Sequence, residues 1–207
     1  RYMKNFLQLY CGGKVDGIIA DLGVSSYQFD TPEKGFSIRY NGRLDMRMNQ
    51  NAAVDAANVV NTYDVSSLTS VLSRYGELRN ARAIAETISM AREVKPIETT
   101  DELKETVARF LPKGSENKVL AQIFQALRIE VNEEMKVLEL FLSQCADVLN
   151  PGGRLVVLSY HSLEDRLVKN FMKTGNADGN LEKDFFGNQL TPYKLITSKP
   201  IVPSDEE

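Results

Sequence analysis

Two short apolar runs constrain the fold of this chain most strongly. The first extends from Val15 to Gly23 and the second from Arg154 to His161. An apolar run of this length, bounded by glycine or polar residues, is typical of a strand that is buried on both faces, as in a parallel sheet. Helical periodicity fills most of the remaining chain. Strands that alternate with helices indicate an α/β fold built on a parallel sheet.

The segments around the two strands predict helices. We expect a short amphipathic helix at 2–9 and a long helix at 120–149 that breaks near Asn132. Helix caps are expected at Ser66 or Ser67, at Thr100 and at Ser162. Residues 193–202 look like a late strand, and Pro200 would confine that strand to a sheet edge.

Residues 52–112 carry apolar residues at helical spacing and contain no strand candidate. This pattern predicts an all-helical unit inserted after the first strand. The chain then divides into a sheet domain made of 1–48 and 131–207, and an inserted helical domain at 49–130. The polar stretch at 24–51 is unusually long for a connecting loop, and such loops in compact domains usually have a function.

Composition and charge exclude several classes of protein. With 43% hydrophobic and 26% charged residues, the chain resembles ordinary globular proteins. A net charge of −3 excludes a protein that coats nucleic acid through its overall positive charge. It does not exclude a local basic patch. No apolar run approaches the roughly 18 residues of a membrane span. Cys11 and Cys145 make no disulfide framework, so we expect a reducing, cytoplasmic location.

Polar residues follow both predicted strands, at the position where open α/β sheets bind ligands. The Asp21 carboxylate can accept hydrogen bonds from an amine of a cofactor or substrate, and a turn or cap role is the alternative. Gly23 permits close approach to the backbone, and Gln28 adds a donor nearby. His161, the only histidine, is either a general base or, as we prefer, a hydrogen-bonded structural residue.

Other chemistries lack their motifs. No Gly-x-Ser-x-Gly elbow is present, which argues against a hydrolase triad. One histidine and scattered carboxylates show no metal-ligand spacing, so no metal is expected. The glycine pairs at 12–13 and 152–153 precede strands, whereas a phosphate-binding loop must follow a strand and open a helix.

The stretch from Lys34 to Arg47 is locally basic. Four positive residues against one negative residue, Asp45, give it a net charge of +3. Aromatic and methionine side chains lie between the charges, so the stretch suits phosphate contacts and base stacking through Arg39, Arg43 and Arg47. The alternative is a loop that packs on the helical block.

Six blocks of the sequence occur together in one known family. They are DLGVSS from Asp21, GFS from Gly35, LDMRM from Leu44, YGE from Tyr75, FQALRIEVN from Phe124 and SYHSLEDR from Ser159. These blocks, in order along nearly the whole chain, closely resemble the bacterial 16S ribosomal RNA cytosine-N4 methyltransferases of the RsmH/MraW type.

The resemblance implies a class I, Rossmann-like methyltransferase that depends on S-adenosylmethionine and carries an inserted all-helical domain. Such enzymes methylate the exocyclic N4 of a cytosine in the decoding region of 16S rRNA. The implied partner is the small ribosomal subunit, with no DNA and no membrane. Asp21 and Gln28 match cofactor-contacting positions of the family. The family's other cofactor contacts precede the position of Arg1, which implies an N-terminally truncated chain.

The implied reaction starts from an activated methyl group, so the enzyme mainly holds N4, methyl and sulfur in line. A hydrogen-bond acceptor beside N4 would take up developing positive charge, and we expect Asp21 or the backbone carbonyls after it to supply one. Asp45, Arg47, Asn132 and His161 are further candidates for orienting the RNA or the base. The alternative function is a non-catalytic RNA- or ribosome-binding module. Open sheet edges would favour association, so we also consider a homodimer.

Overall fold

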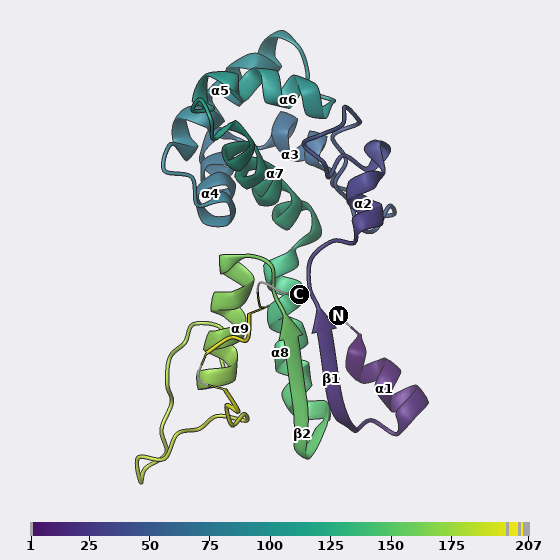
Figure 1. Cartoon of the computed structure of the whole chain (residues 1–207), viewed down its shortest axis with the longest axis vertical. Coiled ribbons are helices and arrows are strands. Elements are labelled where there is room, and N and C mark those ends of the chain that lie inside the picture. The colour runs from purple at the N-terminus through teal and green to yellow at the C-terminus, as the bar shows by residue number, and fades with distance from the viewer. Residues whose placement is uncertain (1, 198, 203, 205–207) are drawn as a thin grey trace. The chain divides into compact units, whose positions relative to one another are not determined.

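A computed structural model describes residues 2–197, 199–202 and 204 of the chain (Figure 1). Its internal contacts divide the chain into two compact units. The sheet unit comprises Arg1–Gly23 and Met135–Glu207, and the helical unit comprises Val24–Glu134. Among the described residues, no helix has the length and apolar character needed to cross a membrane.

The sheet unit is built on two parallel strands. Helix α1 (Met3–Cys11) ends at Gly12, whose φ of +70° suits a glycine, and β1 (Val15–Asp21) follows. Strand β2 (Leu149–Leu158) pairs with β1 in parallel, with Asp21 opposite Leu158. The predicted α/β class and parallel pairing are therefore confirmed. Both strands end at the same edge, as the two arrowheads in Figure 1 show.

The prediction that both faces of the strands are buried is wrong. Leu155 and Val157 pack on a core from α8 (Glu134–Val148) and α9 (Ser162–Thr174). Ile19 and Val156 are paired in register on the opposite face, and both are exposed. In the described part of the chain, no buried core forms against that face. Side chains of a strand alternate between faces, so helices that cover one face leave the other open.

The helical unit surrounds one continuous hydrophobic core. Its helices confirm the prediction of a helical stretch without strands at 52–112. They are α3 (Ala56–Thr62), α4 (Val65–Gly76), α5 (Ala81–Val94), α6 (Thr100–Val107), the short η2 (Ala108–Phe110) and α7 (Glu116–Asn132). Helix α4 packs against both α5 and α7, which places fully buried Leu72, Ile84 and Leu127 at the centre.

Helix caps lie one to three residues before the predicted positions. Asp64, instead of Ser66 or Ser67, caps α4 by accepting a hydrogen bond from the Ser67 backbone N–H. Thr99 caps α6, and Glu102 completes a capping box with it. The capping residue must have an extended backbone while its side chain reaches the N–H of the third helical residue. Residue type alone does not show which of several neighbouring candidates meets both conditions.

The polar stretch after β1 belongs by its contacts to the helical unit, whereas the sequence assigned it to the sheet domain as far as residue 48. It contains α2 (Ser26–Asp30) and η1 (Pro32–Lys34). Phe36, Leu44 and Met46 are buried members of the helical core. These three side chains therefore follow the alternative interpretation, a loop that packs on the helical block.

The long helix breaks where the sequence predicts. Helix α7 ends at Asn132, Glu133 has a left-handed backbone with a φ of +50°, and α8 begins at Glu134. The late strand predicted at 193–202 is not formed at its described positions, and residue 198 lies outside them. Tyr193 instead packs edge-on against Phe171 and donates a 3.0 Å hydrogen bond to the Leu142 carbonyl, which ties this segment to the helices.

Candidate active site

Asp21 and Tyr160 meet where the two parallel strands end. Asp21 is the last residue of β1, and Tyr160 follows the end of β2. The Tyr160 hydroxyl donates a 2.7 Å hydrogen bond to Asp21 Oδ1. That hydrogen bond is the largest cause of a raised pKa of Tyr160. Both residues are exposed, so a ligand can reach this carboxylate and this ring.

Gly23 lies beside the same pair. Its φ is +86°, a left-handed conformation that strains most residues. A Cβ at this position would lie 3.5 Å from the Tyr160 Cδ2 atom. Asp21, Gly23 and Tyr160 thus form one polar and aromatic surface at the strand ends. Tyr160 was not among the predicted site residues, although its place directly after a strand is the signal that identified Asp21.

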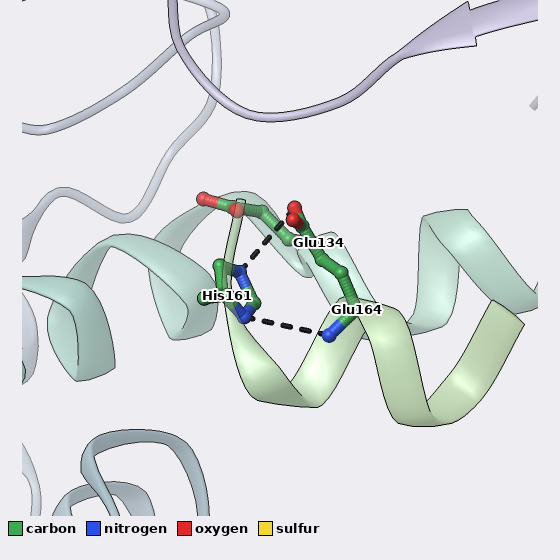
Figure 2. Close-up of side chains that lie close together, drawn as sticks. All are labelled: Glu134, His161 and Glu164. Carbon is green, nitrogen blue, oxygen red and sulfur yellow. Dashed lines mark hydrogen bonds and ion pairs between the residues drawn. The ribbon is translucent and has the colours of Figure 1, made fainter. Parts of the chain in front are cut away.

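His161 caps helix α9, as Figure 2 shows. Its Nδ1 accepts a hydrogen bond from the Glu164 backbone N–H at 3.4 Å, and its Nε2 lies 3.3 Å from Glu164 Oε1. An accepting Nδ1 in the neutral ring leaves the proton on Nε2. Buried Glu164 also accepts a 3.0 Å hydrogen bond from the Tyr160 backbone N–H. The histidine and the glutamate therefore fix the chain immediately after β2.

Gln28, the other predicted cofactor contact, lies in the helical unit. It occupies the third position of α2, and its Oε1 accepts a 2.9 Å hydrogen bond from the Ser25 backbone N–H in a capping box. Its amide nitrogen is the end that can donate to a ligand.

Buried Asp45 and half-buried Arg47 form an ion pair in the helical unit. Arg47 donates from Nε and Nη2 to the two Asp45 carboxylate oxygens at 2.8 and 2.7 Å, and from Nη1 to the Ala52 carbonyl at 2.8 Å. The Arg47 side chain is 17% exposed and the Asp45 side chain is 6% exposed. Burial acts to raise the pKa of Asp45, but the hydrogen bonds and charge of Arg47 outweigh it and hold that pKa below its usual value. This pairing argues against an RNA contact by Arg47.

The other two predicted RNA contacts have side chains that face solvent. Arg39 is exposed, and 66% of the Arg43 side chain is exposed although its Nη2 pairs with Asp55 at 3.0 Å. Tyr40 and Met48 on the same loop are also exposed. The loop therefore keeps two arginines and an aromatic ring that can contact a nucleic acid.

Asn132 holds the same loop from the end of α7. Its Nδ2 donates 2.8 Å hydrogen bonds to the Met46 and Arg128 carbonyls, and its Oδ1 accepts a 2.8 Å hydrogen bond from the Met48 backbone N–H. Met46 has a φ of +59°, unusual for a residue with a side chain. The structure thus fixes the loop in two ways: Asn132 holds its backbone at Met46 and Met48, and the neighbouring Arg47 pairs with Asp45.

Comparison with known proteins identifies the family of this chain. The sequence profile described as the MraW methylase family matches residues 1–207. The chain belongs to the MraW methylase family. The prediction of the family, and with it of a methyltransferase, is confirmed.

Curated relatives are similar over the whole chain. A protein of Parabacteroides distasonis is 54% identical over 100% of this chain and 68% of its own length. One from Flavobacterium johnsoniae is 55% identical over 100% of this chain and 68% of its own length. One from Flavobacterium psychrophilum is 56% identical over 100% of this chain and 71% of its own length. Each is named ribosomal RNA small subunit methyltransferase H.

The capping geometry predicts how substitutions of His161 behave. His161→Ala removes the cap of α9 and should lower the free energy of unfolding by about 1 kcal/mol. His161→Asn keeps a cap acceptor and should retain methylation within about threefold, because asparagine caps well but cannot act as a general base. Urea unfolding and initial methylation rates check this. A loss of activity in the asparagine variant that equals the loss in the alanine variant would support the general-base interpretation instead.

The network around Asn132 predicts a second result. Asn132→Ala leaves two carbonyls and one N–H without their side-chain partner and should lower the free energy of unfolding by about 2 kcal/mol. Asn132→Asp has the same shape but replaces the two donors with an acceptor, so it should destabilise at least as much. Urea unfolding followed by circular dichroism measures both variants. A stable aspartate variant would contradict the donor role of the amide.

Proposed function

We propose that this chain transfers a methyl group from S-adenosylmethionine to the exocyclic N4 of a cytosine in the decoding region of 16S rRNA. Family membership over residues 1–207 and the names of the curated relatives support an RNA methyltransferase of the small ribosomal subunit. The structural observation that carries the proposal is the exposed Asp21–Tyr160 pair at the ends of two parallel strands.

The strand-end residues fit a cofactor that bears an amine. Asp21 Oδ1 accepts from Tyr160, so Oδ2 is the oxygen that a ligand N–H can address. Gly23 has no side chain to prevent a ligand from reaching the backbone. S-adenosylmethionine supplies a methyl group that is activated by its bond to a positively charged sulfur.

The chain's own residues have to orient the cytosine amine. The N4 lone pair is conjugated with the ring, so N4 is a weak nucleophile. An acceptor that holds an N4 hydrogen favours the attacking geometry and stabilises the positive charge that develops on nitrogen as the N–C bond forms and the C–S bond breaks. We assign this acceptor to the Asp21 carboxylate or to the backbone carbonyls that follow it. N4 afterwards loses one proton to solvent.

The helical unit supplies RNA contacts in this proposal. Exposed Arg39 and Arg43 bind phosphates, while the Asp45–Arg47 ion pair and the hydrogen bonds of Asn132 keep their loop in shape. We therefore assign Asp45 and Asn132 to positioning of the RNA-binding loop.

The proposal is tested with small ribosomal subunits that lack this modification and with labelled S-adenosylmethionine. We expect label in 16S rRNA, and N4-methylcytidine after digestion of that RNA to nucleosides and mass spectrometry. A parallel reaction with the Asp21→Ala variant is the control. Label at another atom or another nucleotide, or no label in RNA, would overturn the assignment.

A further inference from the structure

Tyr160 is an exposed aromatic side chain whose position is nevertheless fixed. The hydroxyl of Tyr160 donates a 2.7 Å hydrogen bond to Asp21, and its backbone N–H donates a 3.0 Å hydrogen bond to buried Glu164. The first partner ends β1 and the second lies in α9, so two elements hold the residue that follows β2. An exposed tyrosine without such anchors would sample several rotamers.

The ring contributes little to the core of the sheet unit. Tyr160 is 68% exposed and is not a member of the hydrophobic cluster around Leu142 and Phe171. Its Cδ2 edge lies beside Gly23, where a larger residue would be in contact with it. A rigid ring that is open to solvent, and held beside a candidate catalytic carboxylate, has the properties of a ligand contact.

A target base supplies the matching chemistry. An enzyme that acts on a base inside folded RNA must first take that base out of its stack, and the base then needs a new stacking surface. Aromatic side chains provide such surfaces for nucleobases of any sequence. A cytosine that places N4 beside Asp21 would come within reach of the ring bonded to Asp21.

We propose that the Tyr160 ring is the stacking surface for the target cytosine and that its hydrogen bond to Asp21 holds the ring in place. This inference rests on the proposed function, because the identity of the base comes from there. The ring is the substrate-contacting part of Tyr160, and the hydroxyl is its anchor.

Two substitutions separate the ring from the anchor. Tyr160→Ala removes both and should raise the Kd and the KM for RNA by about tenfold, the weaker part of the range for base–aromatic stacking. Tyr160→Phe keeps the ring and should raise them no more than about threefold. The Kd for S-adenosylmethionine, measured by calorimetry, should be unchanged in both. Tyr10→Ala is the matched control, since Tyr10 is 75% exposed on α1.

Binding is measured by fluorescence anisotropy with a labelled RNA hairpin of decoding-region sequence, and KM with small subunits. Equal losses in the phenylalanine and alanine variants would overturn the proposal, because the hydroxyl would then be the active part. An unchanged Kd in the alanine variant would also overturn it. If the wild-type protein binds RNA through the ring but transfers no methyl group to N4, the proposed function fails and the stacking assignment stands.

Discussion

Replacing Asp21 with alanine should lower kcat/KM for methylation of small-subunit RNA by at least about 100-fold, the usual cost of removing one preorganised electrostatic contact from a transition state. The substitution removes the carboxylate that ends β1 and also the acceptor for the Tyr160 hydroxyl. Since Asp21 is exposed, the fold should be retained, and thermal unfolding checks this. Steady-state rates at varied RNA and varied cofactor concentration measure the effect.

Two further variants show which property of Asp21 matters. Asp21→Asn keeps an oxygen that accepts from Tyr160 but removes the negative charge. Compared with Asp21→Ala, it should therefore recover RNA binding to a greater extent than kcat. Asp16→Ala is the matched control. Asp16 lies on the same strand and pairs with Asn150 at 2.8 Å, and its loss should leave the rate within about twofold. Full activity of the Asp21→Ala variant would show that the strand-end carboxylate is not part of the reaction.

Removing Arg47 should have the largest effect on stability. Arg47→Met leaves the Asp45 carboxylate buried without its partner and should lower the free energy of unfolding by about 3 kcal/mol. The double variant Asp45→Asn with Arg47→Met removes both charges and should recover part of this loss. The difference between the variants in urea unfolding gives the coupling energy of the pair.

The same pair predicts a pH dependence with a definite sign. The folded-state pKa of Asp45 lies below the usual 3.8, so its contribution to stability is present above that value and is lost as the pH falls through the folded-state pKa. The destabilisation caused by Arg47→Met should therefore be full near neutral pH and should decrease in acid, as Asp45 becomes protonated. An equal effect of the substitution at about pH 3 and about pH 7 would contradict this account.

Much of the architecture could be predicted because it depends on local patterns. The apolar runs ending at Asp21 and Leu158 are short and glycine-bounded, and they do form the parallel pair. The break near Asn132 follows from the sequence in the same way. Which strand face becomes buried could not be predicted, because it depends on what packs against it. Ile19 and Val157 are equally apolar, and only Val157 meets a helix core.

The residues of the candidate site likewise differ in whether local sequence alone identifies them. Asp21 is recognisable from its position at the end of a strand. Tyr160 also follows a strand, but only the hydrogen bond to a residue 139 positions earlier distinguishes it from its polar neighbours. Arg43 and Arg47 lie in one basic stretch and look alike in sequence, yet the first faces solvent and the second is enclosed by Asp45 and Ala52. Charge patterns do not distinguish a side chain that binds a partner from one that binds its own loop.

The two units differ greatly in the size of their cores, and this has a thermodynamic consequence. In the described part of the chain, the helical core holds 23 buried residues and the core of the sheet unit holds four. Asp21 and Tyr160, which must stay together, are thus carried by the less strongly packed unit. A ligand that binds only the paired strands adds a stabilisation of RT ln(1 + [L]/Kd) to that unit. Such a ligand would then act as part of the structure of the sheet unit, whose melting temperature should rise with the concentration of the ligand.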